Sequence, residues 1–320
     1  MNFMPRDIPL INSRIKSGQA RVYTELEVRE ALEQGKSFET LDADIVTMAF
    51  QSSMSGTSAM LLVPVTSRGV FTRAEAIWLN GLSGYPGPAP NERLGMVDTL
   101  VFADQQHPER PSYSGANLLV DMLQDNQIFA RCLSVEGDTY ESSFAMRRLE
   151  FARFYILNAF IPPSRWNPPF GEKNVNAHIR AIHTGSKVLV NGAMGIVIGT
   201  GTCDSPERKS LSLTADMQDM DSDAIGEIEM DEGLPLANSI ALALPVTGKD
   251  VMESIATYLR RLERDESGRG ISAADERMSV RLKERIQEGG FMLTESDFVL
   301  GECLPGPASA AGRQGAVTRP

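Results

Sequence analysis

The stretch DIVTMAFQSSMSGTSAMLLVPV, residues 44–65, sets the expected fold of this chain. Residues 44–50 are apolar and partly β-branched, which predicts a buried strand. Small, mostly polar residues follow at 51–60, and a second apolar run occupies 61–65. A strand that ends in a loop of small residues is a frequent ligand site in α/β proteins, because loop N–H groups are free to bind anions.

Strand and helix signals alternate on both sides of this stretch. Residues 10–32 predict a helix, a short extended piece and a second helix, which begins at Thr24 in a capping box with Glu27. The other predicted strands lie at 76–81, 129–135, 140–144, 187–190, 196–198, 211–214 and 240–246, and the other predicted helices at 116–123, 149–160 and 250–264. The alternation predicts an α/β or mixed α+β fold.

The domain organisation follows from proline content and chain composition. Four prolines at 161–171 mark the best candidate for a subdomain boundary, so residues 1–304 are expected to form one large domain or two subdomains. From Pro305 onward the chain lacks aromatic residues and is rich in Ala, Gly, Pro and Arg. This composition predicts a disordered tail at 305–320.

Charge and hydropathy exclude several classes of protein. The 320 residues carry a formal net charge of −11, which would repel a phosphate backbone and argues against nucleic acid as a partner. No apolar run reaches the roughly 18 residues of a membrane-spanning helix, and the N-terminus lacks the pattern of a secretory signal. We therefore expect a cytoplasmic protein with no membrane partner.

Cysteine and histidine spacing argues against a metal or disulfide protein. The three cysteines, Cys132, Cys203 and Cys303, are odd in number and far apart, which disfavours a disulfide framework, a zinc site and an iron–sulfur cluster. The three histidines match no metal-binding motif. No metal and no cofactor held by the chain are expected.

Two loops of small residues are candidates for chemistry. Residues 52–58 could hold a carboxylate, sulfonate or phosphate, or could be a tight turn packed under another element; the Lys of a P-loop is absent. Gly199-x-Gly201 follows a predicted strand but gives only half of a dinucleotide fingerprint. Cys203 lies in the same loop, where the neighbouring Asp204 and Glu207 raise rather than lower a thiol pKa.

Three stretches carry a resemblance to a known family. They are INSRIKSGQARVYTELEV (11–28) with ADIVTMAF (43–50), IWLNGLSGYPGPAPNERLGMVD (77–98), and GSKVLVNGAMGIVIGTGTCDSPERKSLSLTADMQDMD (185–221). From Ile11 to about Val246 the chain resembles the homocysteine-biosynthesis protein family. MSGT (54–57) and YPGPAPNERLG (85–95) look more like its branch called methanogenesis marker protein sixteen, which has been linked to coenzyme M synthesis.

The resemblance implies a sulfur-transferring enzyme that turns a small anionic aldehyde into the matching thiol. Branch likeness favours sulfoacetaldehyde and coenzyme M; the founding branch implies aspartate semialdehyde and homocysteine. A non-catalytic scaffold or sulfur-carrier partner is the third alternative. The chain holds no reductant, so an external reductant, a sulfur donor and a ferredoxin-like or sulfur-carrier protein are expected, and a homo-oligomer is predicted.

The chain departs from the family at both cysteines that are thought to carry sulfur. Where the homocysteine branch has Met-Cys-Ser-Ser-Gly-Ala, this chain has residues 54–59, MSGTSA, and where that branch has Asp-Cys-Tyr it has residues 138–140, DTY. A serine hydroxyl cannot hold a persulfide, so sulfide must arrive free or on a partner, or Cys203 must carry it, or the reaction differs.

The loops and the resemblance together define the predicted site. Cys203 and Ser55 are the expected catalytic residues. The expected substrate-binding residues are Ser53, Gly56, Thr57, Asn91, Arg93, Gly199, Gly201 and Thr202. This site requires residues 52–58 and 199–203 to meet in space.

Overall fold

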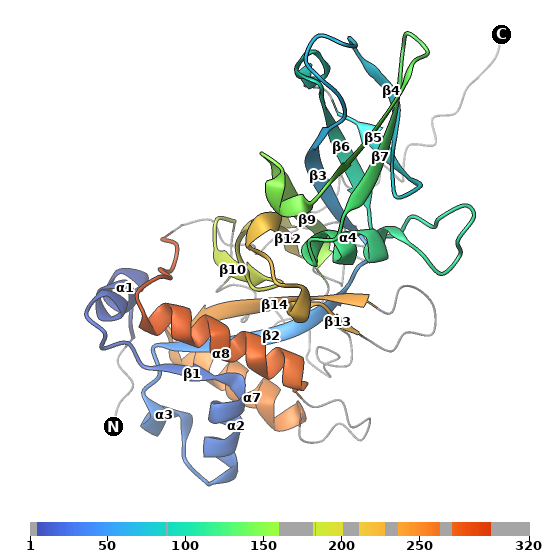
Figure 1. Ribbon diagram of the computed structural model, residues 1–320. Helices are drawn as coiled ribbons and strands as arrows, with labels where there is room; N and C mark the ends of the chain where they lie inside the picture. Colours follow the sequence, from blue (N-terminus) through green and yellow to red (C-terminus); the bar gives the residue numbers. More distant parts are fainter. Residues whose placement is uncertain are drawn as a thin grey trace, which may run out of the picture.

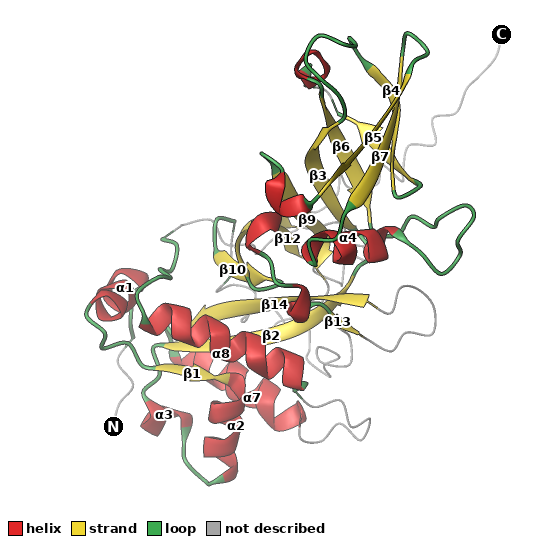
Figure 2. Cartoon of the chain, viewed as in Figure 1, coloured by secondary structure: helices red, strands yellow, loops and turns green. Residues whose placement is uncertain are grey.

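The computed structural model describes residues 5–87, 89–159, 182, 184–200, 211–227, 236–262 and 271–295. It confirms a mixed α/β fold, built on a single sheet (Figures 1 and 2). The strands are β1 (Val22–Thr24), β2 (Ile45–Ser53), β3 (Thr57–Pro64), β4 (Ala74–Leu79), β5 (Leu82–Pro86), β6 (Met96–Phe102), β7 (Ile128–Ser134), β8 (Thr139–Phe144), β9 (Ala152–Ala159), β10 (Lys187–Val190), β11 (Ala193–Thr200), β12 (Leu211–Asp216), β13 (Gly226–Glu227) and β14 (Leu236–Pro245). The helices are α1 (Ile8–Lys16), α2 (Glu25–Glu33), α3 (Phe38–Leu41), α4 (Gly115–Leu123), α7 (Lys249–Leu262) and α8 (Ala273–Gln287), with 3-10 turns η1 (Asn91–Leu94), η2 (Met146–Arg148), η3 (Met217–Asp219) and η4 (Ser222–Ala224).

The order of strands in the sheet forces it to curl. The order is β1-β2-β14-β10-β11-β12-β9-β3-β6-β5-β4-β7-β8, with β13 beside β14, so five strands separate β2 from β3. In a flat sheet their spacing would be about 29 Å. Only residues 54–56 join Ser53 to Thr57, and this connection spans at most about 14 Å. The sheet therefore bends until the end of β2 and the start of β3 come together.

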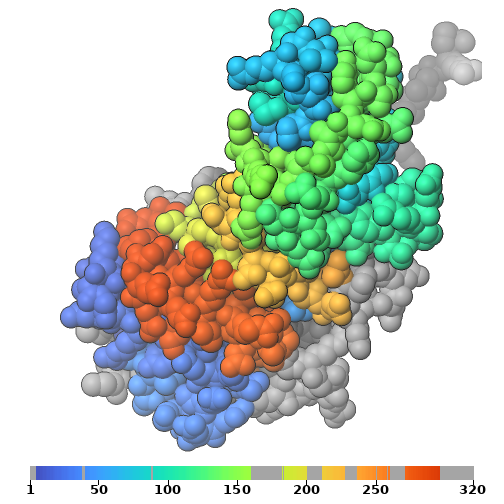
Figure 3. All heavy atoms as spheres, in the orientation of Figure 1, coloured from blue at the N-terminus to red at the C-terminus, as the bar shows by residue number. Residues whose placement is uncertain are grey.

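Helices cover both faces of the part of the sheet that holds β1, β2 and β14. Met278, Leu282 and Ile286 of α8 pack with α1 on one face, while α2 and α7 contribute to the main core on the other. Figure 2 shows the helices gathered around these strands, and Figure 3 shows α8, in red, covering the face on which it packs with α1. The strands from β3 to β8 form the other half of the molecule (Figure 1). α2 begins at Thr24 with the predicted capping box.

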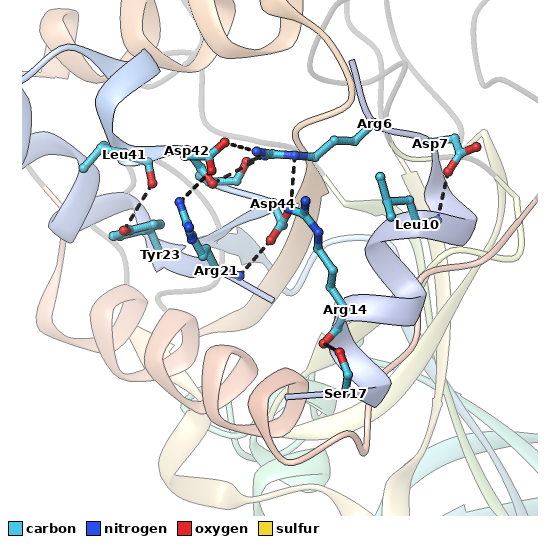
Figure 4. A network of polar contacts seen from close by, with 11 residues as sticks. Arg6, Asp7, Leu10, Arg14, Ser17, Arg21, Tyr23, Leu41, Asp42 and Asp44 are labelled. Carbon is cyan, nitrogen blue, oxygen red and sulfur yellow. Dashed lines mark hydrogen bonds and ion pairs between the residues drawn. The ribbon is translucent and has the colours of Figure 1, made fainter. Parts of the chain in front are cut away.

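The start of β2 is held by a network of ion pairs (Figure 4). The Asp44 carboxylate, whose side chain is fully buried, lies 2.6 Å from Arg14 Nη1 and 3.3 Å from Arg6 Nε. It also accepts a hydrogen bond from the backbone N–H of Arg21 at 2.9 Å. Asp42 pairs with the side chains of Arg6 and Arg21. These contacts join the segment before α1 to Asp42 and Asp44, which directly precede β2, the second strand from one edge of the sheet.

The prediction of a helix at 149–160 is wrong, because this segment contains strand β9. Burial alternates along β9, with Ala152, Phe154 and Ile156 in the core and Leu157 exposed. That is the period of a strand with one buried face, and the aromatic and β-branched residues of this segment favour it. β9 pairs with β3 on one side and β12 on the other.

Other predicted elements agree with the structure, including the β7–β8 hairpin and the strands at 187–190 and 211–214. The predicted subdomain boundary at 161–171 and the predicted tail at 305–320 lie outside the described residues. No helix among the described residues is long and apolar enough to cross a membrane.

Candidate functional site

The predicted anion loop is much shorter than the sequence suggested, because β2 runs to Ser53 and β3 begins at Thr57. The turn between them, residues 54–56, is closed by a hydrogen bond from the N–H of Thr57 to the carbonyl of Met54 at 3.0 Å. Gly56 has a φ of +74°, in the left-handed region. A Cβ atom there would lie 1.8 Å from Oδ1 of Asn158, so this side chain sits directly against the glycine.

Ser53, Ser55 and Gly56 form the accessible part of the turn. Ser55 is exposed, whereas Ser53 and Gly56 are half-buried. The N–H of Ser55 donates to Ser53 Oγ at 3.1 Å, and the carbonyl of Gly56 accepts from the N–H of Leu157 at 2.9 Å. The accessible surface of the turn therefore offers serine hydroxyls and backbone groups, all neutral, to a ligand.

Thr57 lies behind this surface. It is 1% exposed, and its Oγ1 accepts a hydrogen bond from Asn238 Nδ2 at 2.8 Å. Asn238, on β14, in turn accepts from Asn191 Nδ2 at 2.9 Å. Thr57 is thus the last residue in a series of buried side-chain hydrogen bonds that links β14 to β3.

The structure places Gly199 and the turn at a common end of four neighbouring strands. Gly199 pairs with Ser212 near the start of β12, β12 pairs with β9, and Leu157 near the end of β9 contacts Gly56. Three strand spacings, on the order of 14 Å, separate the two glycines. Residues 201–203, which include the predicted Gly201, Thr202 and Cys203, lie outside the described residues.

Asn91 and Arg93 are not brought to the turn. They belong to η1, which lies beside the opposite end of β3, where the carbonyl of Gly95 accepts from the N–H of Val65 at 2.9 Å. The eight residues of β3 span about 26 Å. The Asn91 side chain donates to Asp98 at 3.1 Å, and Arg93 is exposed. Sequence proximity to a proline-rich loop could not reveal on which end of the strand these residues fall.

The second position at which the family's cysteine is replaced is also far from the turn. Thr139 begins β8, whose Ser142 hydroxyl donates to the carbonyl of Pro64 at 2.7 Å, at the end of β3 opposite the turn. On the adjacent strand, Cys132 is fully buried, and burial, with a smaller contribution from Glu92, raises the pKa of its thiol to about 11. Cys132 is therefore a core residue rather than a reactive thiol. Among the described residues no group of acidic, histidine and cysteine side chains could hold a metal ion.

Sequence reasoning missed three asparagines around the turn: Asn158, Asn191 and Asn238. Asn238 and Ser239 are the two polar residues in the otherwise apolar strand LANSIALALP, and this is the signal that could have identified Asn238. Asn191 lies in the tight Asn-Gly turn between β10 and β11, where its φ is +48°. Asn-Gly is a common turn sequence, so the pattern predicts a turn and gives no sign of a further role. Asn158 was assigned to a helix rather than to β9, so its approach to Gly56 could not be expected.

Comparison with known proteins gives several matches. Among them, an uncharacterized protein of Methanothermobacter thermautotrophicus is 33% identical over 281 residues, which cover 79% of this chain and 65% of that protein. Proteins of Methanosarcina acetivorans and Methanocaldococcus jannaschii, both named L-aspartate semialdehyde sulfurtransferase, are 22% and 21% identical over 77% and 78% of this chain. The chain spans only 55% and 56% of the length of these two relatives. No solved structure matches it.

The family comparison covers both halves of the fold. Residues 20–159 and 174–263 match a family model, and this match contains β1 to β14, the turn at Gly56 and Asn238. The placement in the coenzyme M branch stays a prediction. The chain belongs to the family described as homocysteine biosynthesis enzyme, sulfur-incorporation.

Proposed function

We propose that this protein is a sulfurtransferase that converts a small anionic aldehyde into the corresponding thiol. Family membership and the names of two distant relatives support the reaction class. The turn at 54–56 is the observation that locates the proposed site. It offers accessible serine hydroxyls beside a glycine in the left-handed region, and it lies within a stretch that the family model matches.

The reaction has two steps. The aldehyde R–CHO reacts with H₂S to give the thioaldehyde R–CHS and water, as a C=S bond replaces the C=O bond. Two electrons and two protons then reduce R–CHS to R–CH₂SH. The electrons come from an external reductant, such as a ferredoxin-like protein, and sulfide arrives free or on a sulfur-carrier protein.

In the proposed site, Ser53, Ser55 and Gly56 hold the substrate. Charged groups strengthen hydrogen bonds from neutral donors, so hydroxyls in a half-buried turn suit a carboxylate or sulfonate. Gly199, with Gly201, Thr202 and Cys203 beyond it, would approach the carbonyl, where loop N–H groups stabilise negative charge on oxygen. Cys203 is the proposed sulfur carrier of the chain: its thiolate would take the outer sulfur from a donor persulfide, which leaves as a thiolate, and two electrons and two protons from the external reductant would then release that sulfur as H₂S. Asn91 and Arg93 are left out of this site because they lie at the far end of β3.

Sulfoacetaldehyde is our favoured substrate and coenzyme M the favoured product. The absence of the family's two cysteines supports a departure from the founding reaction, and the MSGT and YPGPAPNERLG stretches support the coenzyme M branch. The names of the Methanosarcina and Methanocaldococcus relatives support the alternative, aspartate semialdehyde and homocysteine.

The test is to incubate the purified protein with sulfide, a low-potential reductant and either aldehyde, and to measure coenzyme M and homocysteine. We expect coenzyme M, and none above background from a Ser55→Val, Cys203→Ala double variant. Homocysteine alone, together with rescue of a homocysteine auxotroph, would replace the favoured substrate by the alternative. No thiol from either aldehyde, with tight binding of a partner protein, would reject catalysis in favour of a scaffold or carrier.

A further inference from the structure

A chain of buried amides ends at the proposed substrate turn. Asn191, Asn238 and Thr57 come from the β10–β11 turn, β14 and the start of β3, and each is at most 1% exposed. Their side chains are hydrogen-bonded in series, from Asn191 Nδ2 to Asn238 Oδ1 at 2.9 Å and from Asn238 Nδ2 to Thr57 Oγ1 at 2.8 Å. The chain thus links three segments that are up to 181 residues apart.

Backbone contacts fix the direction of this chain. Oδ1 of Asn191 accepts the N–H of Ser239 at 2.9 Å, so the oxygen and nitrogen of this amide cannot be exchanged without loss of that bond. Asn191 must therefore donate to Asn238 through Nδ2. Asn238 then accepts through Oδ1 and must donate through Nδ2 to Thr57.

The direction decides what the Thr57 hydroxyl can do. Because its oxygen already accepts from Asn238, its hydrogen is left to donate elsewhere. Within the part of the chain that the structure describes, this hydroxyl makes no other hydrogen bond. Hydrogen bonds in series polarise one another, which makes the last hydroxyl a better donor.

A second hydroxyl beside the chain is also unused. Ser52 pairs with Asn238 between β2 and β14, so their side chains share one face of the sheet. Ser52 is 1% exposed, and its Oγ has no hydrogen-bond partner. Buried hydroxyls without a partner are uncommon in proteins. Within the described residues Ser52 has no partner and Thr57 has a hydrogen that is not donated, so both hydroxyls beside Asn238 can donate to an oxygen-bearing ligand.

We propose that Asn191 and Asn238 are positioning residues, which hold the substrate turn through Thr57 and orient its hydroxyl as a donor to an oxygen atom of the bound anionic substrate. This inference rests on the proposed function for the identity of the ligand. The substrate needs a hydrogen donated by the Thr57 hydroxyl, and that hydrogen is free only if Asn238 donates to Thr57 and does not accept from it.

The Asn238→Asp variant tests the direction of the hydrogen bond to Thr57 separately from its presence. A carboxylate keeps the size of the side chain and can still bond to Thr57, but only by accepting its hydrogen, which is then lost to the substrate. We expect the dissociation constants of sulfoacetate and L-aspartate, the stable acids that correspond to the two aldehydes, to rise at least tenfold in calorimetry. Thr57→Val introduces no charge and should weaken binding to the same extent, whereas Thr57→Ser should restore it to within about threefold.

Asn80→Asp is the matched control. Like Asn191, Asn80 has a positive φ, of 49°, in an Asn-Gly turn, and its Oδ1 accepts a backbone N–H, that of Phe129, at 2.9 Å; it is half-buried. It makes no contact with Thr57, so this variant should bind both acids as the wild type does. Wild-type affinity in Asn238→Asp, or equal loss in Asn80→Asp, would overturn the proposal.

Hydrogen exchange tests positioning without a ligand. In Thr57→Val, the backbone amides of residues 54–58 should exchange at least tenfold faster, while those of β8 stay unchanged. Unchanged exchange at 54–58 overturns the positioning role. If the wild type binds neither acid and makes no thiol, the proposed function fails, and this measurement still decides whether the amide chain holds the turn.

Discussion

The two ends of strand β2 are held by different kinds of polar network. At its start, the Asp44 carboxylate pairs with two arginines and accepts a backbone N–H, so all of its partners come from the protein (Figure 4). At its far end, Asn238 belongs to a neutral network, and the hydroxyl of Ser52 beside it has no partner in the part of the chain that the structure describes. A network with every group paired can only hold the fold, whereas one with unused donors can also bind a ligand.

Loss of Asp44 should have the largest effect on stability. Asp44→Asn removes the charge that faces Arg6 and Arg14, and the side chain of Arg6 is only 5% exposed. Removing one partner of a buried ion pair costs about 3–5 kcal/mol, and because Arg6 keeps its pair with Asp42 we expect the lower end of this range. Urea denaturation should show this loss of unfolding free energy; a loss below about 1 kcal/mol would mean that the ion pairs do not hold the start of β2.

Gly56→Ala should have the next largest effect, at the other end. The positive φ costs an L-residue about 1–2 kcal/mol, and the new Cβ meets Asn158. The double variant Gly56→Ala, Asn158→Ala should recover the part of the loss that comes from this contact. Because the two residues touch, a double-mutant cycle of unfolding free energies measures their coupling, and additive losses would contradict the clash.

Arg21→Gln should cost less than about 1 kcal/mol, since Arg21 and Asp42 are 56% and 42% exposed. Salt screens exposed pairs, so the difference from the wild type should shrink further in 1 M NaCl. A loss as large as that of Asp44→Asn would show that the exposed and buried parts of this network act as one unit.

Ser52→Ala should have the smallest effect on stability and should sharpen the contrast with Asp44. The Ser52 hydroxyl is buried without a partner, so its removal should leave the unfolding free energy unchanged or raise it by up to about 1 kcal/mol. Binding of sulfoacetate should nevertheless weaken. A clear loss of stability would show that the hydroxyl has a structural role in the folded protein.

Local patterns account for much of the fold. The capping box at Thr24, the β7–β8 hairpin and the strand at 211–214 depend on neighbours within a few residues, and all three are present. The helix predicted at 149–160 failed because a short apolar segment fits either period until its neighbours are known. β3 and β12 on its two sides make it a strand.

The candidate site likewise has one part that local sequence predicts and another that depends on strand pairing. The composition of residues 52–58 identified a turn of small residues with Gly56 in it, because glycine and serine carry a local signal. The separation of Asn91 and Arg93 from that turn depends on which end of β3 they flank, and this is a property of strand pairing. Asn238 is part of the candidate site only because β14 pairs with β2.

The sequence by itself determined the main strands, the helix starts, the family and the serine-glycine turn, since each is written in residues close together or in a motif. The tertiary structure alone decided that the sheet curls, that Gly199 and Gly56 share an end of the sheet, and that Asn191 is linked to Thr57 through Asn238. The physical reason is that strand pairing and side-chain hydrogen bonds join residues that are far apart in the sequence, and their geometry exists only once the strands have paired and the sheet has curled.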